Sequence, residues 1–102
     1  MSLVSFPSWG ETKDDLVHRD WVYYKKFSDV PFTGEVTGEW NGLFKNGKEE
    51  GYWVTYWSNG QLMSKGVYKT GKRVGEWLGF KPDGTVLEPL TGTFKNGVKV
   101  SD

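Results

Sequence analysis

The stretch Gly42-Leu43-Phe44-Lys45-Asn46-Gly47 decides the fold, because the chain repeats its pattern twice. The pattern Gly-x-aromatic-Lys-x-Gly returns at residues 66–71 (GVYKTG) and 92–97 (GTFKNG), at spacings of 24 and then 26 residues. Between these copies lies a second motif, residues 51–56 (GYWVTY), which returns 24 residues later at 75–80 (GEWLGF). Self-similarity at a fixed short period is typical of repeat proteins built from one small structural unit.

Turn residues separate the motifs, as in Asn46-Gly47, Asn59-Gly60 and Asp83-Gly84. Asn-Gly and Asp-Gly tolerate the positive φ angles of tight β-hairpin turns. Each unit therefore predicts two short strands, and the chain predicts a meander of roughly seven or eight antiparallel strands. We expect Pro89 to mark a bulge or a loosened loop, because proline has no N–H to donate to a ladder.

The composition points to the same fold class. The 102 residues include 17% aromatics and 14 glycines, with no alanine and no isoleucine, which disfavours long helices and favours strands. The predicted fold is all-β, an antiparallel β-hairpin repeat forming a meander or solenoid sheet with a short N-terminal helical turn. Zero net charge disfavours a nucleic-acid partner, and no apolar run is long enough for a membrane span.

The N-terminal residues differ from the repeats. Thr12-Lys13-Asp14-Asp15 has the pattern of a capped helix start, which predicts a helical turn through about Arg19. We therefore divide the chain into an N-terminal segment, residues 1–19, and a repeat domain, residues 20–102. Residues 4–10 could be the tail of a secretory signal, and residues 1–3 a cloning remnant. This favours a periplasmic or secreted location.

Aligning the copies assigns residues to the two faces of the sheet, since alternate side chains of a strand point to opposite sides. One face is apolar in every copy and is the expected core: Val22, Val54 and Leu78, with Tyr24, Tyr56 and Phe80. The other face carries a tryptophan column: Trp21, Trp53 and Trp77.

The tryptophan column has two interpretations. Counting back from the Asn59-Gly60 turn places Trp53 opposite Gly66, and a ring over a cross-strand glycine is a known sheet device. In this interpretation the tryptophans and the repeated glycines Gly42, Gly66 and Gly92 are structural. The alternative is a row of exposed rings that stacks on a ligand.

Trp57 is the candidate binding residue, because its column is otherwise lysine (Lys25 and Lys81). A residue that departs from the repeat is where a specific function would be added. We therefore predict a contact site formed by Trp57 with its neighbours Trp53 and Tyr52. The alternative is that Trp57 packs against the N-terminal segment, at Phe6 or Trp9, and closes the fold.

No catalytic, cofactor or metal site is indicated. His18 is the single histidine, no cysteine is present, and the adjacent pairs Asp14-Asp15 and Glu49-Glu50 point their carboxylates apart in a strand. We therefore expect a protein that is not an enzyme and needs no cofactor.

The unit Asn46-Gly47-Lys48-x-x-Gly51-x-Trp53-x-x-Tyr56-x-x-Asn59-Gly60-x-Leu62 resembles the MORN repeat. The resemblance is to the variant found in bacterial YwqK-like proteins, which carry an antitoxin family name. It covers about residues 20–100, and Pro31-Phe32-Thr33-Gly34 resembles the segment that often opens these proteins. The chain departs from the pattern at Asp20-Trp21, where a glycine is usual, and in its 26-residue last unit. The resemblance implies a β-hairpin solenoid with a non-catalytic role.

The expected function is therefore a non-enzymatic protein-interaction or scaffold module, with an inhibitor- or antitoxin-like role included. Its partner would be a protein that the sequence does not identify. The alternative is a glycan-binding or cell-wall-binding module that uses exposed aromatic side chains.

Overall fold

The computed structural model describes residues 11–102. The expectations for the first ten residues, including the secretory tail and the contacts of Trp57 with Phe6 or Trp9, lie outside these residues. The described chain is mostly antiparallel β-structure with almost no helix, which confirms the predicted fold class. Its elements are η1 (Lys13–Asp15), β1 (Leu16–Arg19), β2 (Val22–Lys25), β3 (Gly34–Val36), β4 (Trp40–Lys45), β5 (Lys48–Tyr56), β6 (Leu62–Lys69), β7 (Lys72–Gly79), η2 (Glu88–Leu90), β8 (Gly92–Lys95) and β9 (Val98–Ser101).

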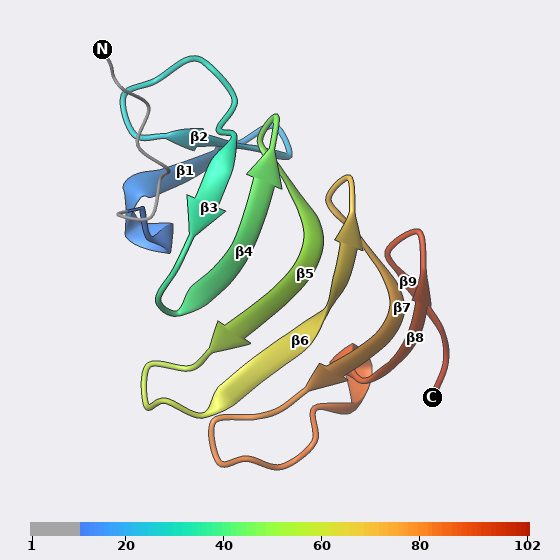
Figure 1. Cartoon of the computed structure of the whole chain (residues 1–102). Coiled ribbons are helices and arrows are strands. Elements are labelled where there is room, and N and C mark those ends of the chain that lie inside the picture. The colour runs from blue at the N-terminus through green and yellow to red at the C-terminus, as the bar shows by residue number, and fades with distance from the viewer. Residues whose placement is uncertain (1–10) are drawn as a thin grey trace.

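The strands form a hairpin and a meander. β3 to β9 lie side by side in chain order in one sheet, and β1 pairs only with β2 (Figure 1). The hairpin joins residues on both sides of the boundary we expected after residue 19. Residues 11–102 contain no helix long and apolar enough to cross a membrane.

The N-terminal helical turn is present but shorter than predicted. Thr12 caps a single 3-10 turn, because its hydroxyl accepts from the Asp14 amide and its own amide donates to the Asp15 carboxylate at 2.8 Å. The chain then becomes a strand at Leu16 instead of continuing to Arg19. Strand pairing in the β1–β2 hairpin, where Leu16 lies opposite Lys25, satisfies the backbone N–H and C=O groups of these residues. In a longer helix the same groups would have bonded within the helix.

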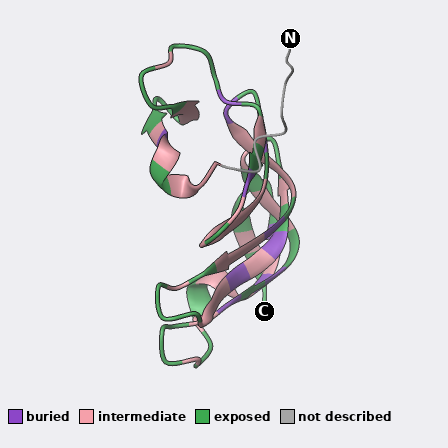
Figure 2. Cartoon of the chain, turned by 60° about the vertical axis from the view of Figure 1, so that its left-hand side comes forward, coloured by how far each residue is buried: buried purple, intermediate pink, exposed green. Residues whose placement is uncertain are grey.

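The core lies on the face opposite to the one we predicted. None of the six expected core residues is buried, and Tyr56 and Leu78 are exposed. The buried hydrophobic residues include Val36, Phe44, Trp53, Trp77 and Phe94, which share the other face of the sheet. We call this the inner face, because the β1–β2 hairpin lies on that side of the curved sheet, as the near edge-on view of Figure 2 shows.

A ladder of aromatic rings explains why this face is buried. Along the inner face, rings contact edge-to-face in the order Phe44, Trp53, Tyr68, Trp77 and Phe94, with centroids 4.9, 5.9, 4.9 and 6.4 Å apart. Aromatic rings remove large areas from water and gain further energy in edge-to-face pairs. The valine and leucine side chains on the outer face are smaller than these rings, so their burial would remove less apolar area from water.

The predicted register is confirmed at the tryptophans, although the covered glycine differs. Trp53 lies opposite Gly66, and Trp77 lies opposite Gly92. However, the Trp53 ring covers Gly42 on the preceding strand, and the Trp77 ring covers Gly66. Each tryptophan also donates its indole N–H to the backbone of that strand, at Leu43 and Val67, both at 3.1 Å. Each ring therefore covers the strand before its own.

Trp21 is not the third member of this column. It occupies a turn, is 85% exposed, and has a positive φ of 69°. Its structural equivalent is the glycine of the other hairpin turns, such as Gly47, and not Trp53. The alignment was wrong here because the first unit lacks the glycine that marks the turn.

The last unit contains a helical turn where we expected a bulge or loose loop. Residues 88–90 form η2, and the Thr91 hydroxyl accepts from the Gly79 amide at 2.9 Å and donates to the Gly79 carbonyl at 3.1 Å. The Leu90 side chain lies against Gly79, in the space that a side chain at that position would occupy. Leu90 and Thr91 of this longer unit thus cover the end of β7.

Candidate binding site

A cleft opens between the β1–β2 hairpin, the start of β5 and the turn that joins β6 to β7. We call it the turn cleft; it has a volume of about 510 Å³. Its lining residues come from four strands and two turns: His18, Trp21, Tyr23, Lys48, Glu49, Thr70, Gly71 and Lys72.

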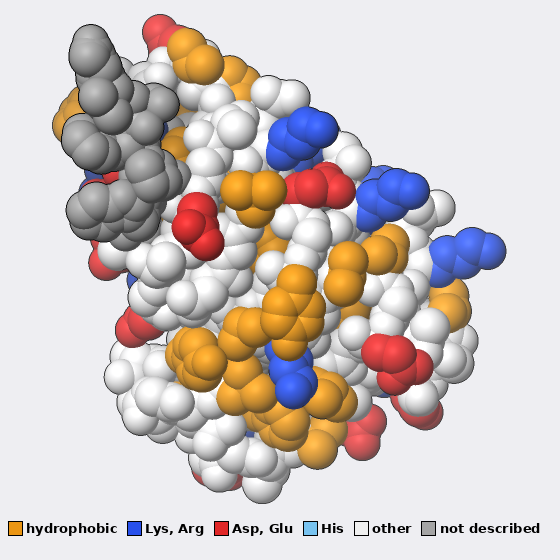
Figure 3. Space-filling view, in the orientation of Figure 1, with side chains coloured by type: hydrophobic (Ala, Val, Ile, Leu, Met, Phe, Trp, Pro, Cys, Tyr) orange, Lys and Arg blue, Asp and Glu red, His pale blue; other side chains and the backbone are white. Residues whose placement is uncertain are grey.

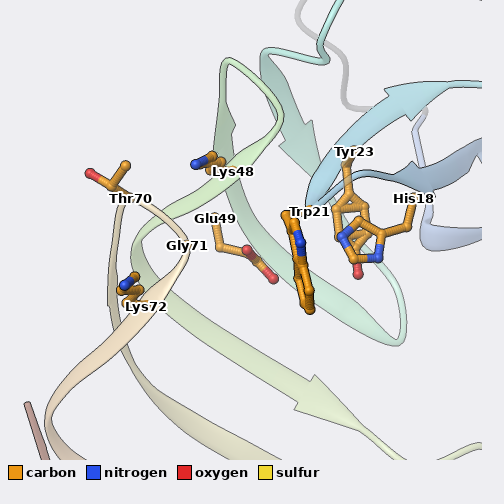
Figure 4. Close-up of a pocket in the computed structure, with 8 residues that line it drawn as sticks. All are labelled: His18, Trp21, Tyr23, Lys48, Glu49, Thr70, Gly71 and Lys72. Carbon is orange, nitrogen blue, oxygen red and sulfur yellow. The ribbon is translucent and has the colours of Figure 1, made fainter. Parts of the chain in front are cut away.

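One wall of the turn cleft is aromatic and the other is polar. His18 stacks on Tyr23 with ring centroids 4.4 Å apart, and Trp21 meets His18 edge-on at 6.3 Å. Figure 4 shows the Glu49 carboxylate directed toward Trp21, whereas the amino groups of Lys48 and Lys72 do not extend toward that wall. The cleft therefore places one carboxylate opposite an exposed indole.

A second hollow of about 320 Å³ continues from the first along the inner face. We call it the aromatic hollow; it shares Tyr23 and Glu49 with the turn cleft. Its other lining residues are Trp40, Trp53, Thr55, Met63, Ser64, Tyr68, Arg73 and Leu90. The Thr55 and Ser64 hydroxyls are hydrogen-bonded to each other at 2.6 Å.

Arg73 is the cation of the aromatic hollow. Its guanidinium lies 5.0 Å from the centroid of Trp77 and 5.7 Å from that of Tyr68, within the range of a cation–π contact. Its Nε is buried and lacks a hydrogen-bond partner among residues 11–102. The ring contacts thus hold the side chain in the hollow, where it can meet a ligand.

Burial and nearby charges set the protonation of the shared residues. Burial raises the pKa of Glu49, and a hydrogen bond from its own backbone amide, together with the nearby His18 and Arg73, opposes this only in part. Burial also raises the pKa of Tyr23 and of Tyr68, and the negative charge of Glu49 adds to both. Both phenols therefore stay neutral donors at neutral pH.

The outer face of the sheet carries a separate feature. Leu43, Tyr52, Val67 and Leu78 are exposed on the strands β4 to β7, and we call them the outer band. Pairing places Tyr52 opposite Val67, and Leu78 opposite Lys65. Figure 3 shows hydrophobic side chains gathered over the central strands of this face, with charged side chains around them.

The three residues of the predicted contact site do not share one surface. Tyr52 is 61% exposed in the outer band, whereas Trp53 is buried in the core on the opposite face. Trp57 is half-buried, and its indole N–H donates to the Phe80 carbonyl at 2.8 Å. This bond ties the β5–β6 loop to the end of β7, so part of the Trp57 ring serves the fold.

Apart from Trp53, sequence reasoning missed the residues that line the two cavities. Tyr68 of the aromatic hollow recurs with Phe44 and Phe94 at the third position of the repeated motif, which is the signal for a common inward direction. Trp21 was visible as a departure from the expected glycine. Trp21 and Glu49 face each other because of the way the β1–β2 hairpin packs against the sheet. The sequence repeat gives no information about that packing.

Comparison with known proteins gives no relative: no family model, no curated protein and no solved structure matches this chain. The likeness to MORN repeats therefore stays a prediction from the sequence motifs.

Proposed function

We propose that the chain is a non-enzymatic protein-interaction module that binds a protein partner through its outer band. The observation that carries the proposal is the exposure of Tyr52, Val67 and Leu78 on adjacent strands of the sheet. Contiguous apolar side chains rimmed by charge are characteristic of surfaces that bind other proteins.

The polar rim of the band supports a protein partner. Lys65 and Glu76 line a shallow depression of about 240 Å³ together with Tyr52 and Leu78. An exposed tyrosine beside a positively and a negatively charged residue is typical of an interface hot spot and its polar rim. By the resemblance to YwqK-like proteins, the proposal includes a module that inhibits its partner.

The test is partner capture with substitutions in the band. The tagged wild-type chain is purified from the source organism together with any bound protein. The same is done with the variants Tyr52→Lys and Leu78→Lys, and with Val98→Lys as a control on the exposed edge strand β9. We expect each band variant to lose the captured protein at unchanged thermal stability, and the control to keep it. Equal capture by all four proteins would contradict the proposal.

A further inference from the structure

The four tight hairpin turns of the described chain share one backbone geometry. Both central residues have positive φ in each turn: Asp20 and Trp21, Asn46 and Gly47, Thr70 and Gly71, and Asn96 and Gly97. At the second position the angles are 69°, 79°, 81° and 85°. Turns of this kind favour glycine there, because a side chain clashes with the backbone at positive φ.

Trp21 departs from this preference for glycine, and its ring is not part of the core. It is 85% exposed, and the ring contact recorded for it is the edge-on one with His18. A bulky residue in a disfavoured backbone region, outside the core, points to a use of the side chain itself. Since the three turns of the same geometry in the meander use glycine, this position has no structural need for an indole.

The position of the Trp21 ring indicates what this side chain is used for. Its ring stands at the mouth of the turn cleft, opposite the carboxylate of Glu49 (Figure 4). No side-chain hydrogen bond to Glu49 from another residue is recorded among residues 11–102, although burial disfavours its charged form. A half-buried carboxylate of this kind gains from hydrogen-bond donors that a ligand supplies.

The charges around the cleft select the class of ligand. A cationic group beside Glu49 would meet the guanidinium charge of Arg73, which acts on that carboxylate, and an anionic group would meet Glu49 itself, which is directed toward Trp21. A neutral molecule with many hydroxyl groups avoids both conflicts, because its hydroxyls donate to the carboxylate and carry no charge. A sugar ring also has an apolar face of C–H groups that stacks on an indole.

We propose that the turn cleft binds a neutral carbohydrate, with one sugar ring stacked on Trp21 and hydrogen-bonded to Glu49. The two cavities share Tyr23 and Glu49, so a short oligosaccharide can extend from the cleft into the aromatic hollow. Their volumes, about 510 and 320 Å³, fall in the range of small-molecule sites. This site lies on the inner side of the sheet and is independent of the outer band.

The test measures binding of defined oligosaccharides to the full chain. Cellohexaose, maltohexaose, xylohexaose and chitohexaose serve as neutral probes, oligogalacturonate as the anionic probe and chitosan hexamer as the cationic one. Titration calorimetry and the indole N–H signals in an NMR titration report binding. We expect at least one neutral probe to bind and to shift the Trp21 signal.

The variants Trp21→Gly and Glu49→Gln make the test specific. Trp21→Gly restores the residue of the other turns, so its melting temperature should equal or exceed that of the wild type. Each variant should weaken binding of the neutral probe by about tenfold or more, whereas Tyr52→Lys in the outer band should leave it unchanged. Failure of the outer-band proposal would not alter these results.

Three outcomes would overturn the proposal. The first is that no neutral probe binds, or that only a charged probe does. The second is that Trp21→Gly binds the neutral probe as the wild type does. The third is a lower melting temperature of Trp21→Gly, which would show that the indole serves the fold and not a ligand.

Discussion

At the scale of single residues, the pairing of tryptophan with glycine decides which face of the sheet is buried. Gly42 and Gly66 leave flat backbone that the rings of Trp53 and Trp77 cover, and the indole N–H groups fix those rings by hydrogen bonds. The glycines are therefore required for the absence of a side chain and not for a special φ angle, because neither has a positive φ.

Gly66→Val should destabilise the chain by about 3 kcal/mol, because the new side chain would overlap the Trp77 ring. Urea unfolding monitored by tryptophan fluorescence measures the change. Lys65→Val is the matched control, since it places the same side chain on the neighbouring residue of β6 at the outer face, and should change stability little. An unchanged unfolding midpoint for Gly66→Val would mean that Trp77 does not cover this glycine.

Glu49 gives the chain a pH dependence of defined sign. Burial raises its pKa in the folded state above the ordinary value of 4.5, so the folded chain holds this proton more tightly than the unfolded chain. The stabilising contribution is therefore full at pH values below 4.5, and is lost as the pH rises through the raised folded pKa.

Glu49→Gln, which stays neutral, should consequently be more stable than the wild type at pH 7 and about equal to it near pH 4. Urea unfolding at the two pH values measures this. A variant less stable than the wild type at pH 7 would mean that attraction to Arg73 outweighs the cost of burial. The same carboxylate would then be structural.

At the scale of elements, the turns were the most predictable part of the chain and the first hairpin the least. Asn46-Gly47 and Asn96-Gly97 combine the two residue types that tolerate positive φ, so hairpins there follow from local chemistry. The β1–β2 turn has Asp20-Trp21, which carries no such signal. The capping pattern at Thr12 was correct, but nothing local ended the predicted helix before Leu16.

The first hairpin is attached to the sheet through the β4–β5 turn. The Gly47 carbonyl accepts from the Tyr23 amide at 2.8 Å, and the Gly47 amide donates to the Phe32 carbonyl at 2.7 Å. A Cβ at Gly47 would overlap Val22 and lie 2.8 Å from the Tyr23 carbonyl oxygen. The equivalent position in the β8–β9 turn, Gly97, has only the Lys72 side chain nearby, at 3.7 Å.

This difference predicts unequal effects of one substitution in two turns of the same geometry. Gly97→Ala should cost about 1 kcal/mol, because alanine resists the positive φ. Gly47→Ala adds a clash with the docked hairpin and should cost about 3 kcal/mol. Thermal unfolding of both variants measures the difference. Equal costs would mean that the hairpin does not pack on this turn.

At the scale of the whole molecule, the choice of buried face was the step that the sequence could not decide. Both faces of the sheet present recurring apolar columns, so alternation alone fits either orientation. The structure buries the ring ladder, and leaves Val22 and Val54 half-buried and Leu78 exposed. The residues of both proposed sites follow from this choice, because it opens the cavities on one side and the outer band on the other.

The order of the strands also predicts how the molecule opens. β5 and β6 are paired on both sides within the meander, β9 is paired on one side, and β1 and β2 pair outside it. Native-state hydrogen exchange should therefore be slowest for amides of β5, β6 and β7, and about a hundredfold faster or more for β1, β2 and β9.

In Gly47→Ala, exchange in β1 and β2 should accelerate more than in β9, because that substitution disrupts the docking of the first hairpin. If the amides of β1 exchanged as slowly as those of β6, the hairpin and the meander would form one cooperative unit. In that case the turn cleft between them would be a rigid site and not one that can open.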